Sequence, residues 1–475
     1  MVELTRGLKK FAAGVGQNQR IAVCNGVYDF SNHTAGWLRS AEFFVLLGPG
    51  PRALGRFSGD RKRIQGHLMT KKTIAVFFGG RSPEHDVSVV SALQVMSALD
   101  RSLYDVVPVY LATDGRWWTG EALMQRESYL PSPEVLATLT QVSLDMSANG
   151  RPTLLSPNAS MFNFGKSAKR IEFDAAIPCF HGLVGEDGQI QGMFETARVP
   201  YTGMRTLASA VLMDKVATKR ILAGADIPQL PYCEIQRPRE GMLVTASELA
   251  PIVGDLKGPW IIKPSHLGSS IGVAKVSSLE ELADVLPEIF KYDTAAILET
   301  FVANMVEYNV SVSRMSGELT TSAIERPKRT DELLNFKEKY LSGGGGKKTG
   351  IKGGAKAPGQ QASEGMLSLT RELNPNIAHL DADIRRWAGL AFDQVGGTGA
   401  PRIDFIGNEE TGELWLNEVN PCPGSFGYFL WEAAPEPLLF SEMLDKLIQE
   451  ALFQHVRGRL PPDPTPSDAR LFSRR

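Results

Sequence analysis

The residues best suited to chemistry lie near the C-terminal end, in the segment RIDFIGNEETGELWLNEVNPCPG, residues 402–424. Side chains alternate between the faces of a strand, so Arg402 shares a face with Asp404, and Glu418 shares a face with Asn420. The short, turn-rich linker predicts an antiparallel hairpin that brings all four onto one face. Two carboxylates and an amide oxygen are hard ligands that suit Mg²⁺. A polar sheet face with a cross-strand ion pair is the alternative.

A second candidate site is the stretch PWIIKPSHLGSSIGVAKV, residues 259–276. Lys263 ends an apolar strand there, and a loop containing Ser269 and Ser270 follows. A lysine beside backbone N–H groups and hydroxyls suits phosphate oxygens. The stretch does not match the pattern GxxxxGK[ST], and many hairpin loops are rich in glycine and serine. These residues alone therefore leave both interpretations open.

Two further basic segments could contact phosphates. Lys215 lies among apolar neighbours in a helical pattern over residues 206–225, where a solvated helix face that includes Lys219 is the alternative. Lys339 precedes a basic, glycine-rich stretch at 341–366, which composition predicts to be flexible. That stretch is either a lid over phosphates or a solvated linker.

Acidic residues next to predicted strands and helices complete the set of candidates. The strand ILETFV, which contains Glu299 and Val302, could present an exposed backbone edge to adenine, and Glu307 could bind ribose hydroxyls. Glu84 lies at a helix start, where an acid also complements the helix dipole. His181 opens the loop HGLVGEDG, which is otherwise typical of an acidic surface loop.

These residues need an α/β framework to position them. The runs 73–78, 106–111 and 174–180 read as strands, and the glycine turn after the first leads into a helix with Pro83 in its first turn. We therefore expect an open parallel sheet with helices on its faces over residues 71–205. Later segments read as strands at 296–302, 308–314, 402–406 and 414–420, and as helices near 384–394 and 437–455.

Composition sets limits on the function. The 475 residues are too many for one ordinary hydrophobic core, so we expect two or three packed units. The net charge of −2 gives no basic field for a nucleic acid. The four cysteines form no CxxC pair, which fits a reducing compartment such as the cytoplasm, and no apolar run reaches the ~20 residues that span a bilayer. We expect residues 1–68 to be a poorly ordered extension and residues 457–475 a loose tail.

Taken in order, these motifs resemble the D-alanine–D-alanine ligase family of the ATP-grasp superfamily over residues 72–450. The most specific stretches are FFGGRSPEHDVSVVS, HGLVGEDGQIQGMFE, VPYTG, LASAVLMDKVATK, IIKPSHLGSSIGV, EYNVSV, EKYLS and RIDF…LNEVNPCPG. The resemblance implies an N-terminal α/β domain followed by two α+β lobes that clasp ATP, at 206–300 and 301–456. It also implies a ligase that forms a peptide bond through an acyl phosphate, for peptidoglycan precursors, and a homodimer is usual for the family.

The resemblance assigns roles to individual residues. For ATP it implies the phosphate ligands Lys215, Lys263, Ser270 and Lys339, an adenine strand from Glu299 to Val302, and Glu307 on the ribose. For two Mg²⁺ ions, with Mn²⁺ as a substitute, it implies Asp404, Glu418 and Asn420. For the first amino acid it implies Glu84, His181, Ser269 and Tyr340. For the oxyanion it implies Arg402 and the N–H of Gly424.

One departure from the family concerns the second amino acid. Where the family has a serine that faces the carboxylate of this substrate, the present chain has Phe429. Either Ser425 or Tyr428 takes over that carboxylate, or the acceptor is a bulkier or less polar amine. Two other functions remain open: the same ATP chemistry on a different amine acceptor, and a nucleotide-binding regulatory protein without catalysis.

Overall fold

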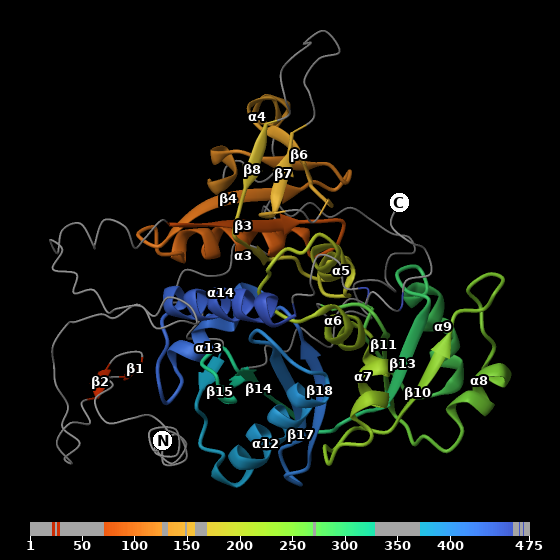
Figure 1. Ribbon diagram of the computed structural model, residues 1–475. Coiled ribbons are helices and arrows are strands. Elements are labelled where there is room, and N and C mark those ends of the chain that lie inside the picture. The colour runs from red at the N-terminus through yellow and green to blue at the C-terminus, as the bar shows by residue number, and fades with distance from the viewer. Residues whose placement is uncertain are drawn as a thin grey trace, which may run out of the picture. The chain divides into compact units, whose positions relative to one another are not determined.

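The computed structural model (Figure 1) describes residues 21–23, 26–28, 71–125, 132–147, 150–156, 169–268, 272–327, 371–458, 465 and 469. The chain divides into two units, Met1–Leu68 and Met69–Arg475. In the first unit, β1 (Ile21–Val23) pairs antiparallel with β2 (Gly26–Tyr28). The predicted lid at 341–366 lies outside the described residues. All that follows concerns the second unit.

The first sheet of this unit has seven strands in the order β8-β7-β6-β5-β4-β3-β9. Among the described strands of this sheet, parallel pairing joins β3 (Lys72–Gly79) to β4 (Tyr104–Leu111) and to β9 (Ala175–Pro178). The remaining strands are antiparallel: β5 (Trp117–Thr119), β6 (Thr140–Leu144), β7 (Thr153–Leu155) and β8 (Arg170–Glu172). The expected open parallel sheet is therefore a mixed one, because residues 112–116 are too few for the crossover that a parallel neighbour of β4 would need.

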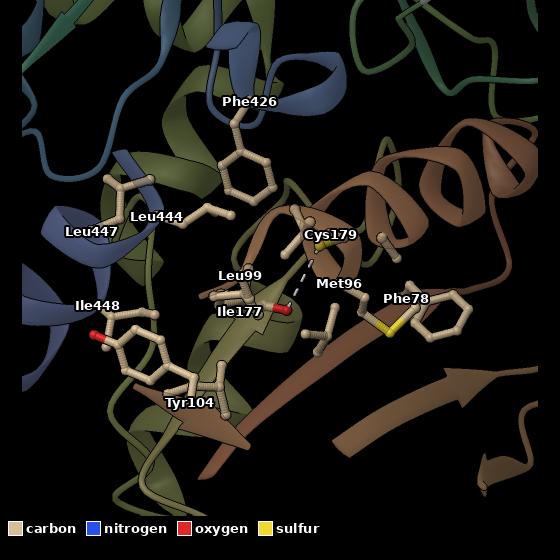
Figure 2. Packing of buried hydrophobic residues seen from close by; sticks show 14 of the residues in the cluster. Phe78, Met96, Leu99, Tyr104, Ile177, Cys179, Phe426, Leu444, Leu447 and Ile448 are labelled. Carbon is tan, nitrogen blue, oxygen red and sulfur yellow. Dashed lines mark hydrogen bonds between the residues drawn. The ribbon is translucent and has the colours of Figure 1, made fainter. Parts of the chain in front are cut away.

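Strand β3 is buried on both faces, as the apolar run TIAVFF predicted. Its even-numbered side chains, such as Val76 and Phe78, pack in one core with α3 (His85–Ala98) and α14 (Phe440–Arg457). Figure 2 shows this core, with Leu444, Leu447 and Ile448 of α14 beside Leu99, Tyr104 and Ile177. The opposite side chains, such as Phe77, pack in a second core with α5 (Gln189–Thr196). Helix α14 thus ties the C-terminal end of the chain to the first sheet.

The second sheet has four antiparallel strands in the order β10-β13-β11-β12. They are β10 (Tyr232–Gln236), β13 (Ala295–Thr300), β11 (Trp260–Pro264) and β12 (Ala274–Val276). Helices α8 (Ala246–Val253) and α9 (Leu279–Ile289) pack on one face through the fully buried residues Leu249, Leu282 and Leu286. Strand β13 is therefore interior, with a paired neighbour on each side.

The third sheet has five antiparallel strands in the order β16-β15-β14-β17-β18. They are β16 (Arg371–Leu373), β15 (Thr320–Pro327), β14 (Met305–Ser313), β17 (Arg402–Asn408) and β18 (Leu414–Asn420). Helix α12 (Ala378–Gln394) packs on the apolar face, where Val310, Ile403 and Phe405 are buried. The other face carries polar side chains, and we call it the polar face of the third sheet.

The helical pattern over 206–225 is two helices, not one, and this prediction was wrong. Asp214 has an extended conformation (φ −91°, ψ 109°) between α6 (Thr206–Met213) and α7 (Lys215–Leu222). Its Oδ1 accepts hydrogen bonds from the N–H groups of Val216 (2.8 Å) and Ala217 (3.0 Å), so Asp214 is the N-cap of α7. The break places Lys215 at the first position of α7, beside the second sheet.

The smaller elements are η1 (Glu121–Met124), α4 (Pro133–Thr138), η5 (Gly424–Gly427) and α13 (Tyr428–Glu432). The expected three-part division is a proposal about domain boundaries. It is consistent with one sheet in each of the segments 71–205, 206–300 and 301–456.

Candidate active site

The predicted hairpin forms, and it groups the four polar residues as expected. In the register of β17 with β18, Arg402 lies opposite Asn420, and Asp404 lies opposite Glu418. The guanidinium of Arg402 donates from Nε to Asp404 Oδ1 (2.7 Å) and from Nη2 to Asp404 Oδ2 (2.7 Å). Asn420 Nδ2 donates to the same Oδ2 at 2.8 Å. All four side chains therefore meet on the polar face of the third sheet.

A β-bulge separates this group from the core-facing residues of the same strand. The register shifts after Asp404, so that Phe405 pairs with Leu416 and Asn417 is left without a partner in β17. An extra residue of this kind resets the alternation of side chains. Leu416 can therefore enter the core while Glu418 stays on the polar face. The sequence pattern gave no sign of the bulge.

The donor set of the hairpin fits a hard divalent cation. Burial raises the pKa of Asp404 to about 6, in spite of the charge of Arg402 beside it. Burial would also raise the pKa of Glu418, but the charges of Lys215, Lys263 and Arg402 outweigh it and lower that pKa. Within the described residues, no group of three or more His, Cys, Asp or Glu side chains is arranged to hold a metal ion by itself. Two carboxylates and one amide oxygen leave coordination positions for water and phosphate, which is the arrangement that Mg²⁺ favours.

Three lysines approach this hairpin from the second sheet and α7. Lys215 Nζ lies 3.7 Å from Glu418 Oε2 and donates to the carbonyl oxygen of Leu267 at 2.6 Å. Lys263 Nζ lies 2.7 Å from Glu299 Oε2 and donates to Asn417 Oδ1 at 3.1 Å. The two predicted phosphate lysines thus meet the hairpin, and the third lysine lies behind them.

Lys219 is that third lysine, and the solvated helix face suggested for it was wrong. Its side chain is 3% exposed, and its Nζ lies 2.7 Å from Glu299 Oε1. Burial would raise the pKa of Glu299, but the charges of Lys263 and Lys219 lower it to about 2. The sequence carried one signal that was missed: Lys215 and Lys219 are four residues apart, so they share a helix face.

The strand expected to read adenine has no free edge at Glu299. Strand β13 pairs with β10 as far as Glu299 and with β11 as far as Thr300. Beyond Thr300, the N–H of Phe301 still donates to the carbonyl oxygen of Pro259 at 2.9 Å, and Val302 is buried in a small apolar cluster with Leu230 and Ile406. The expected exposed edge is therefore wrong for Glu299, whereas Val302 remains a candidate. Glu307 lies opposite Ile406, next to that cluster.

The loop after β11 is held to α7 by His266, which the sequence did not single out. His266 Nδ1 lies 2.8 Å from Asp293 Oδ1, and its Nε2 lies 3.5 Å from Asp214 Oδ2. Hydrogen bonds to Asp214 and Asp293 raise the pKa of His266 to about 10. The backbone N–H of Lys215 donates to the carbonyl oxygen of Ser265 at 3.0 Å. These contacts fix the start of the predicted phosphate loop.

Glu84 lies against two loops, one of which carries His181. A Cβ added at Gly182 would collide with the Glu84 carboxylate, and one added at Gly268 would lie 2.9 Å from Glu84 Oε1. The carboxylate therefore lies between the HGLVGEDG loop and the loop after β11. Gly182 also has a φ of +71°, which other residues rarely adopt, whereas a side chain at Gly268 would require the end of the Glu84 side chain to shift.

His181 is buried and linked to the turn that follows β18. Burial lowers the pKa of His181 to about 4, so its ring is neutral near pH 7. Its Nε2 lies 2.8 Å from Ser91 Oγ, which accepts a hydrogen bond from the N–H of Ser425 at 3.0 Å. A neutral ring acts here through hydrogen bonds and not through charge.

Glu186, in the same HGLVGEDG loop, is a second residue that the sequence did not single out. Its Oε2 accepts from the N–H of Gly182 (2.6 Å), and its Oε1 accepts from the N–H of Cys422 (3.1 Å). Burial raises the pKa of Glu186 to about 8. The carboxyl group joins the loop that carries His181 to the turn that carries Gly424.

The turn after β18 leaves room beside Gly424. A Cβ added there would meet nothing within 4 Å, so the space beside the Cα of Gly424 is open. Ser425 donates its hydroxyl to Gln94 Oε1. Phe429 follows in α13, and the guanidinium carbon of Arg371 lies 3.9 Å from the centroid of its ring. Four predicted site residues lie outside the described residues: Ser269, Ser270, Lys339 and Tyr340.

The sequence is similar to those of known proteins along most of its length. The family described as "D-ala D-ala ligase N-terminus" matches residues 73–204, and "D-ala D-ala ligase C-terminus" matches residues 221–449. A D-alanine–D-alanine ligase of Heliobacterium modesticaldum is 31% identical over 403 residues, which are 82% of this chain and 96% of the relative. Another from Streptomyces griseus is 33% identical over 400 residues, covering 80% and 93%.

A solved structure gives the same result for the fold. The VanG D-Ala:D-Ser ligase of Enterococcus faecalis is 26% identical and has a TM-score of 0.61, covering 80% of this chain and 100% of that one. In the described part of the chain, no helix is long and apolar enough to cross a bilayer. Because these matches cover most of its length, the chain belongs to the D-alanine–D-alanine ligase family.

Proposed function

We propose that this protein is an ATP-dependent ligase that joins two molecules of D-alanine into D-alanyl-D-alanine, a precursor of peptidoglycan. The observation that carries this proposal is the meeting of Lys215 and Lys263 with the Asp404–Glu418 hairpin. Cationic side chains of α7 and the second sheet face hard oxygen ligands of the third sheet, which is the arrangement that a nucleoside triphosphate needs. The relatives that span most of this chain are D-alanine–D-alanine ligases.

In the proposed complex, ATP lies between the second and third sheets. Adenine packs against the apolar cluster of Leu230, Val302 and Ile406, and Glu307 lies near enough to that cluster to bind the ribose. The phosphates extend toward Lys215 and Lys263. Both lysines are nearly buried, so their charges act on the phosphates with little screening by water.

Asp404, Glu418 and Asn420 would hold the Mg²⁺ ions at the phosphate end of the nucleotide. Bound there, Mg²⁺ would neutralise phosphate charge and so reduce the repulsion between the substrate carboxylate and the γ-phosphate. Arg402 has donors left for a substrate, since only its Nε and Nη2 are engaged with Asp404.

The first D-alanine would bind with its ammonium group at Glu84. Its carboxylate oxygen forms a bond to the γ-phosphorus while the bond from that phosphorus to the departing ADP oxygen breaks. The product is an acyl phosphate. The second amine, after losing a proton, attacks the acyl carbon, and the oxyanion of the tetrahedral intermediate faces Arg402 and the N–H of Gly424. Collapse of that intermediate expels inorganic phosphate and leaves the peptide bond.

A second candidate function is the same chemistry with D-serine as the acceptor. Two observations favour it: Phe429 stands where the resemblance predicts a serine, and the VanG protein of similar fold is a D-Ala:D-Ser ligase. The first half of the reaction would be unchanged, because the ATP site and Glu84 do not contact Phe429 in this scheme.

The test is phosphate release from ATP by the purified full-length protein with D-alanine alone, and with D-alanine plus D-serine or D-lactate, together with mass analysis of the product. We expect turnover with D-alanine alone and a dipeptide product. A protein that binds ATP but releases no phosphate with any of these acceptors would favour the non-catalytic regulatory function. A mixed product at low D-serine concentration would favour the second candidate.

A further inference from the structure

Arg371, the first residue of β16, has hydrogen-bonding capacity that the described structure does not use. Its side chain is 19% exposed. Its Nε and Nη1 atoms are buried, and within the described residues neither donates a hydrogen bond. A buried guanidinium with unused donors is costly, since its N–H groups have lost contact with water without gaining another acceptor. Such a group needs an acceptor that arrives from outside the fold.

Phe429 holds this guanidinium in place without satisfying it. The guanidinium carbon lies 3.9 Å from the ring centroid, within the range of a cation–π contact. Stacking of this kind uses the flat face of the guanidinium and leaves its N–H groups free at the edge. Phe429 therefore orients the donors of Arg371 and offers no acceptor to them.

The counterion of Arg371 does not take up these donors either. Glu325 Oε1 lies 3.3 Å from Arg371 Nε, but the contact lacks the geometry of a hydrogen bond. Glu325 is 5% exposed, and it also accepts from Asn309 Nδ2 at 3.2 Å. Glu325 balances the charge of Arg371 while the N–H groups at Nη1 remain open to a second anion.

Arg371 belongs to the same face as the catalytic hairpin. In the sheet register Asn309 lies opposite both Glu325 and Asp404, so the polar side chains form one row across β15, β14 and β17. Arg371 stands at the β16 end of this row, and Lys215 approaches the β18 end, at Glu418. An anion at Arg371 is therefore on the side of Arg402 that faces away from the phosphate lysines.

Phe429 lies just after the turn that carries Gly424, the proposed oxyanion donor. We propose that Arg371, stacked on Phe429, binds the α-carboxylate of the second amino acid. The inference rests on the proposed function and names the acceptor more closely: an amino acid with a free carboxylate. A guanidinium matches a carboxylate with two parallel N–H groups, which positions the acceptor as well as attracting it.

The test is a competition between two acceptors in one reaction. D-Alaninamide has no carboxylate, so it cannot be phosphorylated and can act only as the acceptor. With ATP and equal concentrations of D-alanine and D-alaninamide, mass spectrometry gives the ratio of D-alanyl-D-alanine to D-alanyl-D-alaninamide. This ratio measures selection by the carboxylate and is independent of how much enzyme is folded.

We expect the wild type to favour the acid, and Arg371→Gln to lower the ratio about ten- to a hundredfold, the usual effect of one charge-assisted hydrogen bond. Arg371→Lys should keep part of the selection. The matched control is Arg326→Gln on the neighbouring strand, whose guanidinium pairs with Glu409 at 2.6 Å. The control should leave the ratio unchanged.

Two further variants address folding. Arg371→Gln combined with Glu325→Gln removes both buried charges, and Phe429→Leu removes only the ring beneath the guanidinium. Both should also lower the ratio. If Arg371 had only a structural role, these variants would form less of both products, and the ratio of the two products would stay as in the wild type. That result would overturn the proposal. A wild type that forms neither product would instead refute the proposed function.

Discussion

The ammonium group of Lys215 lies 3.7 Å from Glu418 Oε2, and this ion pair joins a proposed phosphate ligand to a proposed metal ligand. Lys215 starts α7, and Glu418 lies in β18 of the third sheet. Without a nucleotide, each group reduces the cost of burying the other. A bound phosphate and cation would take over both charges, so the same two side chains can serve the empty and the loaded site.

The first prediction concerns the proposed metal ligands. Glu418→Gln keeps the size of the side chain but removes its charge. We expect phosphate release to fall by more than about a hundredfold, because the nucleotide loses its cation. The far-ultraviolet circular dichroism should stay that of the wild type. Glu413→Gln, an exposed change in the turn before β18, is the control. Full activity of Glu418→Gln at saturating Mg²⁺ would refute the metal site.

The second prediction concerns Glu299 between Lys263 and Lys219. Glu299→Gln leaves two buried lysines without their counterion, so the free energy of unfolding should fall by about 3–5 kcal/mol. Lys219→Met should cost clearly less, since Lys263 still neutralises Glu299 at 2.7 Å. Urea unfolding of both variants measures the two values. If Lys219→Met proved the less stable of the two variants, the charge of Glu299 would have a cause other than these two lysines.

The third prediction is a dependence of stability on pH through His266. The pKa of His266 is raised to about 10 in the folded chain, from an ordinary value of 6.5. The charged ring therefore stabilises the fold fully below pH 6.5, and this contribution is lost as the pH rises toward 10. Arg237 and Lys291 also border this site, and they oppose the charge that Asp214 and Asp293 favour.

The measurement is the difference in free energy of unfolding between the wild type and His266→Gln across this range of pH. The difference should be greatest at the acidic end and should shrink at the alkaline end. His379→Gln, an exposed change on α12, controls for the loss of any histidine. A difference that is constant with pH would mean that His266 packs as a neutral ring.

The fourth prediction concerns the segment before β3. Deletion of residues 1–68 should leave kcat and KM unchanged, because the family match begins at residue 73 and β3 begins at Lys72. Deletion through Gly79 should instead give insoluble protein, since it removes β3, the strand that pairs with both β4 and β9 in the first sheet. A soluble protein lacking residues 1–68 but without activity would show that the segment contributes to catalysis.

Local patterns were enough to predict the parts of the site that lie on one element or one hairpin. Arg402, Asp404, Glu418 and Asn420 came together because strand alternation and a short linker leave few other arrangements. The strands at 73–78 and 414–420 and the helix near 437–455 were found close to their observed bounds, whereas the helix expected near 384–394 begins earlier, at Ala378.

The remainder depended on contacts between distant segments. The burial of Lys219 depends on Glu299, which belongs to a strand far along the chain, and a helical pattern does not say which face will be covered. Arg371 gave no signal, because its significance lies in the ring of Phe429 beneath it. The antiparallel extension β5–β8 escaped notice since its strands are short and only partly buried.

The bulge at Asn417 divides β18 into two stretches, one that must fit the hydrophobic core and one that must fit the polar site. Leu414 and Leu416 pack in the core against α12. Glu418 and Asn420 lie on the polar face, where they would contact ligands. In a strand with unbroken alternation, Leu416 and Glu418 would have to lie on the same face of the sheet. With one supernumerary residue between them, substitutions that repack the hydrophobic side need not disturb the oxygens that hold the cation. Loss of that residue would force one set to the wrong side, so a single deletion at 417 should be far more harmful than any substitution there.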